Sequence, residues 1–525
     1  MFLESVIENF DKRADKEIFV EKRNGKYNSI SFSEFKKLIS GVQKEFEDIN
    51  NEDRVVIFME NSPLWIASLF AVMFSGGISV PVDYLLSESE FFNILRDAQP
   101  RFILTSSQNF EKAKSAAENL GYKPEIIDVN TVIPDDRELK IFLPLPDDVA
   151  VILYTSGTTG NPKGVMLTYK NLNHNIEGIR DMKFLSKDDR FVSILPFHHI
   201  YPLVGTLILP LTEGYSLVFI EKLTPTDILS TIREQKVTIM IGVPKLYQVI
   251  YHNILIEISK LPSIKKGIVN SALKLFKKIN AKSIQKKIFK QVHERIGPSL
   301  RYMISGGAKL NVEVARGLES IGFNILEGYG LTETSPLISA NAPQNKRIGS
   351  AGVPIKGVEV KIVDGEITAK GDNVMKGYFN RPEETEKVIK DGWFYTGDLG
   401  YIDNEGFLFI TGRAKDVIVL DNGKNVYPED IENEILKSRY ILEIGVFDED
   451  GVIKAIVKPD FELLIEEEID NIYDFIKSEI KKTTKHLQSY KRVREFKITD
   501  RELPRTRIGK LRRFMLPALY KEIVD

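Results

Sequence analysis

The chain has 525 residues, 43% of them hydrophobic, so it should form at least two domains, because single cores stop growing near ~250–300 residues. Its 72 basic and 74 acidic residues give a net charge of −2, which argues against a general nucleic-acid-binding protein. It has no cysteine, which excludes disulfides, thiolate metal sites and cysteine nucleophiles. The segment from Met1 to Arg13 lacks the apolar core of a signal peptide, so we expect a cytoplasmic protein.

From about residue 50, apolar runs that predict β-strands alternate with helical patterns. Early strands are expected at 54–59, 78–82 and 101–105, with helices at 62–74 and at 87–98, the latter capped by Ser87. Later strands are expected at 191–195, 216–220, 238–241, 301–305 and 324–327. Strands separated by helices predict parallel sheets covered on both faces. The expected fold class is therefore α/β, with stacked parallel or mixed sheets in a large N-terminal domain.

After Asp398 the pattern changes to short strands and helices, which indicates a small, mobile α+β C-terminal domain. Strands are expected at 407–411, 417–420, 444–447 and 452–458, and helices at 428–437 and 466–482. We expect the first domain to span 1–412, a hinge to span 413–416 and the second domain to span 417–525.

The segment from Lys260 to Lys290 contains ten lysines and no acidic residue, interleaved with apolar side chains. One interpretation is a solvated basic face on amphipathic helices. The other is a surface that contacts anionic lipid at the inner membrane face or delivers an amphiphilic substrate.

The run Tyr-Thr-Ser-Gly-Thr-Thr-Gly-Asn-Pro-Lys-Gly at 154–164 follows an apolar strand at 149–153 and carries the strongest functional signal. Glycines let backbone N–H groups surround an anion, hydroxyls add hydrogen bonds, and a lysine adds positive charge. This combination predicts a phosphate-binding loop. It is not the loop of nucleoside triphosphatases, because no Gly-x-x-x-x-Gly-Lys-Ser/Thr occurs in the chain.

This run closely resembles the phosphate-binding signature of the adenylate-forming superfamily, which includes acyl-CoA synthetases, luciferases and peptide-synthetase adenylation domains. The resemblance implies a large ATP- and acyl-binding domain and a small lid domain. It implies that the following residues bind ATP, with Thr155 also near Mg²⁺: Thr155, Ser156, Gly157, Thr158, Thr159 and Lys163.

Two later blocks extend the resemblance. Ser305-Gly306-Gly307-Ala308 corresponds to the family's floor of the adenine and acyl sites, to which Gly306, Gly307 and Ala308 would contribute. Glu327-Gly328-Tyr329-Gly330-Leu331-Thr332-Glu333-Thr334 corresponds to the nucleotide site. There Glu327 and Gly328 would border the nucleotide, Tyr329 would pack on adenine, Thr332 would bind the α-phosphate and Glu333 would hold Mg²⁺.

The C-terminal part contributes the remaining implied residues. Asp398, in Tyr395-Thr396-Gly397-Asp398, and Arg413 would bind the ribose, and Lys415 would be the pivot of the hinge. The loop at Gly423 would meet the pantetheine arm of coenzyme A. Lys510, in the basic tail 503–513, would contact the substrate carboxylate and the α-phosphate, where attack of one anion on another needs a mobile cation.

The resemblance also bears on the acid substrate. The segment 197–200 contains His198 and His199, and by resemblance His199 lines and gates the acyl pocket. Peptide-synthetase domains have an aspartate in this segment, whereas here there is none, so an α-amino acid is disfavoured. Acetyl- and propionyl-CoA synthetases close the pocket with a tryptophan where this chain has Gly330, which implies an open pocket.

The resulting prediction is an AMP-forming fatty acyl-CoA synthetase for a medium- or long-chain acid, using ATP, Mg²⁺ and coenzyme A, with no nucleic-acid partner and with an oligomer allowed. One alternative is a ligase of the same fold that acylates a carrier protein. Another is a non-catalytic ATP- or lipid-binding protein.

Overall fold

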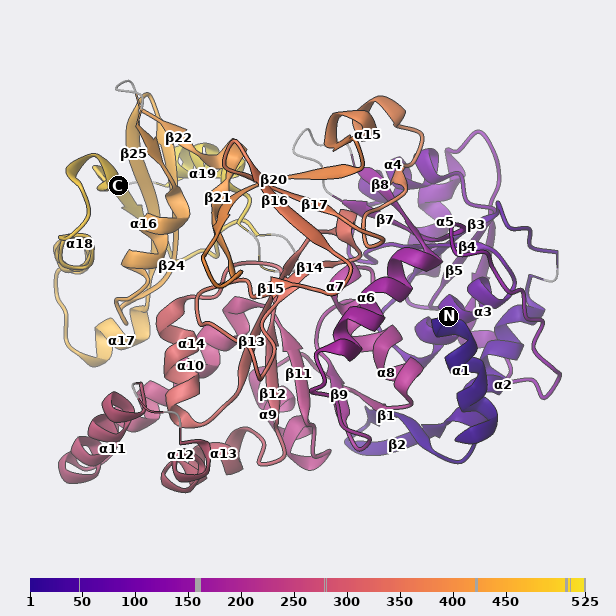
Figure 1. Ribbon diagram of the computed structural model, residues 1–525, viewed down its shortest axis with the longest axis horizontal. Helices are drawn as coiled ribbons and strands as arrows, with labels where there is room; N and C mark the ends of the chain where they lie inside the picture. Colours follow the sequence, from indigo (N-terminus) through magenta and orange to yellow (C-terminus); the bar gives the residue numbers. More distant parts are fainter. Residues whose placement is uncertain are drawn as a thin grey trace.

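The computed structural model describes residues 1–46, 48–155, 162–277, 279, 281–420, 424–505, 509 and 511–523. A large N-terminal domain contains two long β-sheets and most of the helices, and a smaller C-terminal domain packs at one end of it (Figure 1). This is the α/β architecture predicted from the sequence.

The first long sheet has, within the described residues, nine strands in the order β15-β14-β13-β12-β11-β9-β10-β1-β2. Neighbouring strands from β1 to β13 are parallel, and the edge strands β2, β14 and β15 are antiparallel. The bounds are β1 Glu17–Arg23, β2 Lys26–Ser31, β9 Arg190–Ser193, β10 Ser216–Phe219, β11 Ile239–Gly242, β12 Tyr302–Ser305, β13 Ile325–Gly330, β14 Leu337–Ala340 and β15 Val353–Pro354.

The second long sheet has seven described strands in the order β18-β8-β7-β4-β3-β5-β6. The five strands from β7 to β6 are parallel, whereas β8 and β18 are antiparallel. The bounds are β3 Arg54–Phe58, β4 Ile78–Pro81, β5 Phe102–Thr105, β6 Glu125–Asp128, β7 Val149–Thr155, β8 Lys163–Thr168 and β18 Gly377–Tyr378. The phosphate-binding signature therefore joins two antiparallel strands, β7 and β8.

The two long sheets share one hydrophobic core, which contains side chains of β3 and β7 from one sheet and of β1, β9 and β11 from the other. Helices between the sheets complete it: α1 Phe2–Lys12, α2 Phe32–Lys44, α3 Pro63–Phe74, α6 Tyr169–Asp181 and α8 Leu209–Glu213. Every residue of α3 except Leu64 is buried, because the helix is surrounded by apolar neighbours. Its N-cap, Ser62, accepts a hydrogen bond from the Trp65 N–H.

Further helices cover the outer faces of both sheets. α4 Glu88–Ala98 and α5 Phe110–Glu118 pack on the seven-stranded sheet, and Ser87 caps α4 as predicted. α9 Pro225–Glu234, α10 Pro244–Ser259 and α14 Val312–Ile321 pack on the nine-stranded sheet. α11 Ser263–Phe276, α12 Lys282–Ile288 and α13 Lys290–Ile296 lie at the corner below α14, where α11 projects from the body (Figure 1).

A third sheet lies between the long sheets and the small domain. Its described strands are β16 Glu359–Val363, β17 Glu366–Lys370, β19 Ile389–Lys390, β20 Trp393–Ile402 and β21 Leu408–Arg413. The strand expected at 407–411 corresponds to β21, which pairs with β20 and precedes the expected hinge at 413–416. A 3₁₀ turn at Ala414–Asp416 follows β21 directly.

The small domain consists of a three-stranded and a two-stranded sheet with four described helices. Its elements are β22 Ile418–Val419, β23 Asn425–Val426, α16 Pro428–Ile435, β24 Ile441–Glu449, β25 Val452–Pro459, α17 Phe461–Glu466, α18 Ile472–Thr483, β26 Glu495–Ile498 and α19 Leu516–Glu522. The helix expected at 466–482 is present as α18, but it begins six residues later than predicted. The chain leaves α17 at Glu468, which has a φ of 55°, and Asn471 caps a new helix by accepting the Asp474 N–H.

Among the described helices, none is both long and apolar enough to cross a membrane.

Candidate active site

The two ends of the phosphate-binding signature are brought together by the β7–β8 pairing, in which Thr155 and Lys163 are opposite each other. Ser156, Gly157, Thr158 and Thr159 lie outside the described residues. The Lys163 ammonium donates to the Glu384 carboxylate at 2.6 Å, on helix α15 Pro382–Val388. This hydrogen bond, with a second one from Lys387, lowers the pKa of Glu384 to about 2, so the ion pair stays charged at neutral pH.

Tyr378 links this lysine to the predicted metal ligand. The Lys163 ammonium lies 5.1 Å from the centroid of the Tyr378 ring, and the Tyr378 hydroxyl donates to Glu333 Oε1 at 2.9 Å. Burial raises the pKa of the Tyr378 hydroxyl, with the Glu333 carboxylate adding to the shift, so the hydroxyl remains a donor. Glu333 and Thr332 lie in the 3₁₀ turn that follows β13. The fold thus brings the Glu333 carboxylate and the Lys163 ammonium, from two separate motifs, to the same tyrosine.

The predicted ribose residues form a second buried cluster. The Tyr329 hydroxyl donates to Asp398 Oδ2 at 2.8 Å, and the Arg413 Nε group lies 2.8 Å from Asp398 Oδ1. Asp398 on β20 and Arg413 on β21 are opposite each other in the pairing of these strands. Burial, with Asp398 adding to the shift, holds the pKa of Tyr329 far above its usual range, so its hydroxyl donates at all working pH values.

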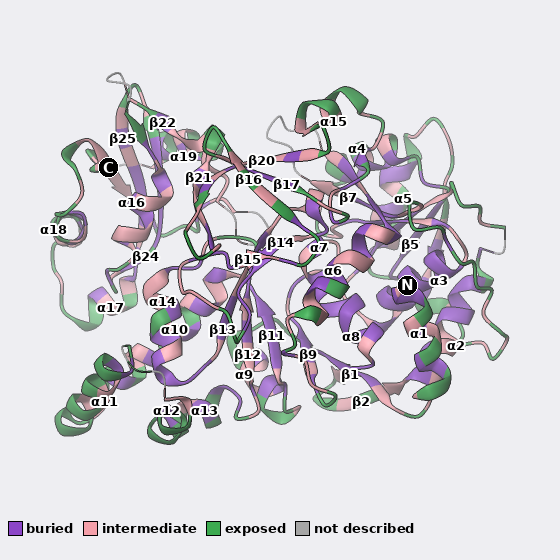
Figure 2. Ribbon diagram, viewed as in Figure 1, coloured by how far each residue is buried: buried purple, intermediate pink, exposed green. Residues whose placement is uncertain are grey.

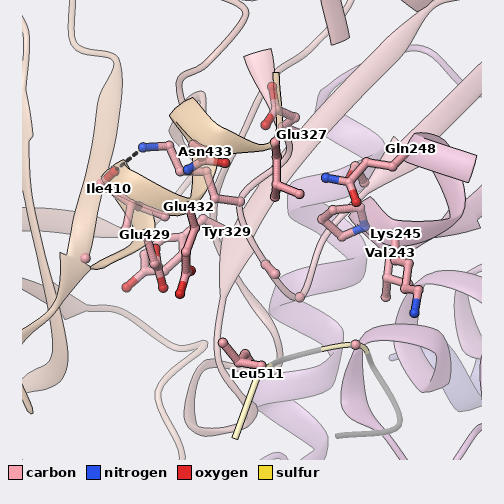
Figure 3. Close-up of a pocket in the computed structure, with 18 of the residues that line it drawn as sticks. Val243, Lys245, Gln248, Glu327, Tyr329, Ile410, Glu429, Glu432, Asn433 and Leu511 are labelled. Atoms are coloured by element: carbon pink, nitrogen blue, oxygen red, sulfur yellow. Dashed lines mark hydrogen bonds between the residues drawn. The ribbon is translucent and has the colours of Figure 1, made fainter. Parts of the chain in front are cut away.

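The Tyr329–Asp398–Arg413 cluster borders a cavity of about 230 Å³ between the two domains (Figure 3). The large domain contributes Gly307, Ala308, Glu327, Gly328, Tyr329, Gly330, Asp398 and Arg413. The small domain contributes Glu429, Glu432 and Asn433 from α16 and Arg505, Gly509, Leu511 and Arg513 from the C-terminal tail. Residues predicted from three separate sequence blocks therefore line one cavity.

The cavity has an unusual carboxyl group at its wall. Glu327 on β13 accepts the Gly349 N–H at 3.4 Å and faces the cavity (Figure 3). Burial raises the pKa of Glu327 to about 7. The side chain is therefore partly protonated near neutral pH.

Comparisons with known proteins agree with this arrangement. The model of the AMP-binding enzyme family matches residues 6–379, and that of the AMP-binding enzyme C-terminal domain matches residues 415–525. The chain belongs to the AMP-binding enzyme family. Its matches place it among the AMP-forming acyl- and aryl-CoA ligases of that family.

The relatives of this AMP-binding enzyme have different acid substrates. The long-chain-fatty-acid–CoA ligase of Bacillus subtilis is 30% identical over 88% of this chain and 84% of the relative. The feruloyl-CoA synthase of an Amycolatopsis species is also 30% identical, over 73% of this chain and 72% of the relative. The solved O-succinylbenzoate coenzyme A synthetase of B. subtilis, in complex with ATP and magnesium ion, has a TM-score of 0.75 and 26% identity, with 98% of this chain and 99% of that chain covered.

Gly330 has a structural requirement that the sequence does not reveal. A Cβ atom on Gly330 would lie 1.7 Å from the carbonyl oxygen of Pro336, because β13 and β14 pair closely there. A glycine is therefore needed at position 330 so that the backbone of Pro336 can approach. This explanation differs from the open acyl pocket that we inferred from the sequence.

The predicted acyl-site residues lie around Tyr201. A Cβ atom on Gly306 would lie 2.8 Å from the Tyr201 ring, and the Tyr201 hydroxyl donates to the Ile304 carbonyl at 3.0 Å. His199 precedes the helix that contains Tyr201, and its ring centroid lies 4.4 Å from that of His198. His198 Nε2 in turn lies 3.9 Å from an Asp83 oxygen.

The hinge and the tail are only partly described. Lys415 lies in the 3₁₀ turn after β21, where burial and the nearby Arg413 lower its pKa. Gly423 and Lys510 lie outside the described residues, but Gly509 and Leu511, which flank Lys510 in the sequence, line the cavity.

Sequence reasoning missed Tyr378, Glu384, Tyr201 and Asp83. Tyr378 and Glu384 lie in the run Gly377-Tyr378-Phe379-Asn380-Arg381-Pro382-Glu383-Glu384, whose glycine and proline indicate only a turn before a helix. Their partners are 45 and 221 residues away in the sequence, so only the fold brings them together.

Proposed function

We propose that the protein is a fatty acyl-CoA synthetase that converts a medium- or long-chain fatty acid, ATP and coenzyme A into acyl-CoA, AMP and pyrophosphate. The observation that carries this proposal is the cavity between the domains, where the Tyr329–Asp398–Arg413 cluster faces the tail residues next to Lys510. The rest of the mechanism follows from the chemistry of the residues around that cavity.

ATP would bind with its ribose at Asp398 and its phosphates at the signature and Lys163. To reach a phosphate, the Lys163 ammonium exchanges its ion pair with Glu384 for one with the nucleotide. Glu333 is suited to Mg²⁺, since this ion is commonly held by one or two carboxylates together with substrate phosphates. When bound, Mg²⁺ would neutralise charge on the triphosphate.

In the first half-reaction a carboxylate oxygen of the acid forms a bond to the α-phosphorus, and the bond from that phosphorus to the pyrophosphate leaving group breaks. Both reactants are anionic, so the cationic Lys510 and the hydroxyl of Thr332 would stabilise the charge that builds up on the α-phosphoryl oxygens. The products are acyl-AMP and pyrophosphate, and no side-chain nucleophile is required.

In the second half-reaction the coenzyme A thiol attacks the acyl carbon, AMP leaves, and the thiol proton passes to solvent. We propose that the small domain first rotates about Lys415 and brings the Gly423 loop to the pantetheine arm. Such a rotation must break the contacts between α10 and the small domain, where Lys245 lies 2.8 Å from Glu443 and His252 lies 3.0 Å from Asp460.

The fatty-acid assignment is supported by the long-chain ligase among the relatives and by the absence of an acidic residue from 197–200. Two observations define the competing acids. A relative of equal identity acts on ferulate, and Asp83 places a carboxylate beside His198 that could pair with an ammonium group.

An acid panel tests the proposal. Purified protein is given ATP and Mg²⁺ with acetate, octanoate, palmitate, ferulate or an amino acid, and AMP release is measured with coenzyme A, with an acyl carrier protein, or with neither acceptor. We expect the highest kcat/KM for octanoate or palmitate, with coenzyme A as the better acceptor. The Asp398→Asn variant is the matched inactive control. Preference for ferulate or the amino acid would contradict the proposed substrate, and preference for the carrier protein would contradict the proposed acceptor. A lack of acid-dependent pyrophosphate exchange would contradict the proposed enzymatic activity.

A further inference from the structure

The surface formed by α11 and α12 combines exposed isoleucine and leucine side chains with lysines, and Figure 2 shows both helices largely exposed. We propose that this α11–α12 surface binds the face of an anionic phospholipid bilayer. The inference goes beyond the proposed ligase reaction and does not depend on it.

An apolar stripe on α11 points away from the protein core. Ile264, Ile268 and Leu275 are 81%, 63% and 52% exposed. At about 100° per residue these positions fall within roughly 40° of each other around the helix. The opposite side of α11 packs against the protein, since Leu273 and Phe276 are buried in the hydrophobic core with α10 and α14. The exposed stripe is therefore a second apolar face, which folding leaves in contact with water.

Lysines flank this stripe on both sides. Lys265 and Lys274 lie roughly a quarter of a turn from it in opposite directions, by the same helical spacing. On α12, Ile284 and Ile288 are exposed on one side of the helix, and Lys287 lies roughly a quarter of a turn from them. A helix with lysines around an exposed Ile/Leu stripe is the composition of helices that lie in the membrane interface.

The nearby acidic side chains do not neutralise these lysines. No acidic residue occurs from 260 to 290. The carboxylates that neighbouring elements present already have other partners: Glu313 pairs with Lys277, Glu319 with Lys282 and Lys346, Glu294 with Lys290, and Glu257 with Arg295. Within the described part of the chain, no carboxylate forms an ion pair with Lys265, Lys274, Lys286 or Lys287.

Charge complementarity favours an anionic bilayer over a second copy of the chain. A twofold interface would bring the same surface of both copies together and place these lysines against each other. Lysine is also depleted from protein–protein interfaces. Anionic lipid headgroups attract the lysines, and the acyl chains below them accept the apolar stripe.

The experiment is co-sedimentation of the full-length protein with vesicles of phosphatidylglycerol and phosphatidylcholine in equal parts, and with vesicles of phosphatidylcholine alone. The wild-type protein should bind the anionic vesicles, and binding should weaken as salt is added. The triple variant Ile264→Ser/Ile268→Ser/Leu275→Ser should lower the partition coefficient on the order of tenfold or more, because those side chains no longer enter the apolar layer. The lysine variant Lys265→Gln/Lys274→Gln/Lys287→Gln should remove the preference for anionic vesicles.

The matched control is Ile133→Ser/Leu145→Ser/Ile465→Ser, which removes three similarly exposed apolar side chains elsewhere on the protein and should leave vesicle binding unchanged. Circular dichroism and thermal unfolding show that each variant is folded. Failure of the wild-type protein to bind anionic vesicles, or equal binding by the α11 triple variant and the control, would overturn the proposal. A change of oligomeric state in sedimentation velocity without a change in vesicle binding would assign the surface to a second copy instead.

Discussion

The Lys163 ammonium and the Glu384 carboxylate lie 2.6 Å apart, so the lysine of the phosphate-binding signature already has an anionic partner. An incoming triphosphate must compete with this carboxylate for the same charge. Glu384 is itself shared, since Lys387 donates to its other oxygen. Breaking this ion pair therefore makes the free energy of ATP binding less favourable.

Replacing Glu384 by glutamine tests this competition. The neutral amide keeps the shape of the side chain but holds the Lys163 ammonium more weakly, so the KM for ATP should fall roughly two- to fivefold, the range for a partly exposed ion pair. Steady-state kinetics at saturating acid and coenzyme A measure the change, and Glu383→Gln on the same helix is the control. A higher KM in the Glu384→Gln variant would mean that the carboxylate positions the lysine instead.

The hydroxyl of Tyr329 should contribute to ATP binding through Asp398. Tyr329→Phe removes the 2.8 Å hydrogen bond that fixes one oxygen of this carboxylate. Because hydrogen bonds to charged groups contribute about 1.5–3 kcal/mol, the Kd for ATP should rise about tenfold or more. Titration calorimetry gives the Kd, and Tyr401→Phe, at a half-exposed tyrosine on β20, the strand of Asp398, should leave the Kd unchanged. Equal Kd values for the two variants would show that the Tyr329 hydroxyl does not contribute to ATP binding.

Glu327 should make stability depend on pH. Its pKa is raised in the folded protein, so the folded state holds the proton more tightly, and stability falls as the pH rises from about 4.5 to about 7. Glu327→Gln is neutral at every pH and should lack this loss, amounting to at most about 3 kcal/mol above pH 7. Thermal unfolding of both proteins across this range measures it. The difference in Tm should grow through the window and then level off; a constant difference would contradict the raised pKa.

Lys510→Ala should separate the two half-reactions. Adenylation should fall by roughly 10²–10³, the scale for removing one group that stabilises transition-state charge. Formation of acyl-CoA from supplied acyl-adenylate should be largely retained, because the proposed rotation withdraws the lysine. Pyrophosphate exchange measures the first step and thioester formation the second. Equal losses in both would contradict the rotation.

Gly330→Ala should destabilise the fold without changing the choice of acid. The added Cβ would meet the Pro336 carbonyl, so the β13–β14 pairing must open. We expect a clearly lower Tm, whereas Gly121→Ala, where a Cβ would meet open space, should be neutral. An acid panel on the folded Gly330→Ala protein should keep the wild-type order. A stable variant that now prefers acetate would instead support Gly330 as a wall of the acyl pocket.

The alternation of strands and helices was predictable because it depends on local apolar patterns and caps. β3, for example, spans Arg54–Phe58 where the sequence predicts 54–59. The break between α17 and α18 was not, because one asparagine cap and one residue with positive φ interrupt a pattern that otherwise favours a continuous helix.

The motifs include some of the residues that line the cavity, such as Tyr329, Asp398 and Arg413, because each motif contains its own backbone geometry and chemistry. They could not predict partners from distant segments. Glu384 is an ordinary acidic residue on a short helix, and its importance comes only from the fold that places it against Lys163. The same holds for Tyr378 and Glu333, and for the backbone that crowds Gly330.

Asp398 and Arg413 are held opposite each other by one antiparallel strand pair, and the 3₁₀ turn with Lys415 starts at the very next residue. A rotation that begins at Lys415 therefore leaves both residues within the large domain. The AMP part of the acyl-adenylate would stay bound to Asp398 and Arg413 while the small domain withdraws Lys510 and brings in the Gly423 loop. The acyl-adenylate, a reactive mixed anhydride, could then pass from one half-reaction to the next without ever being released to water.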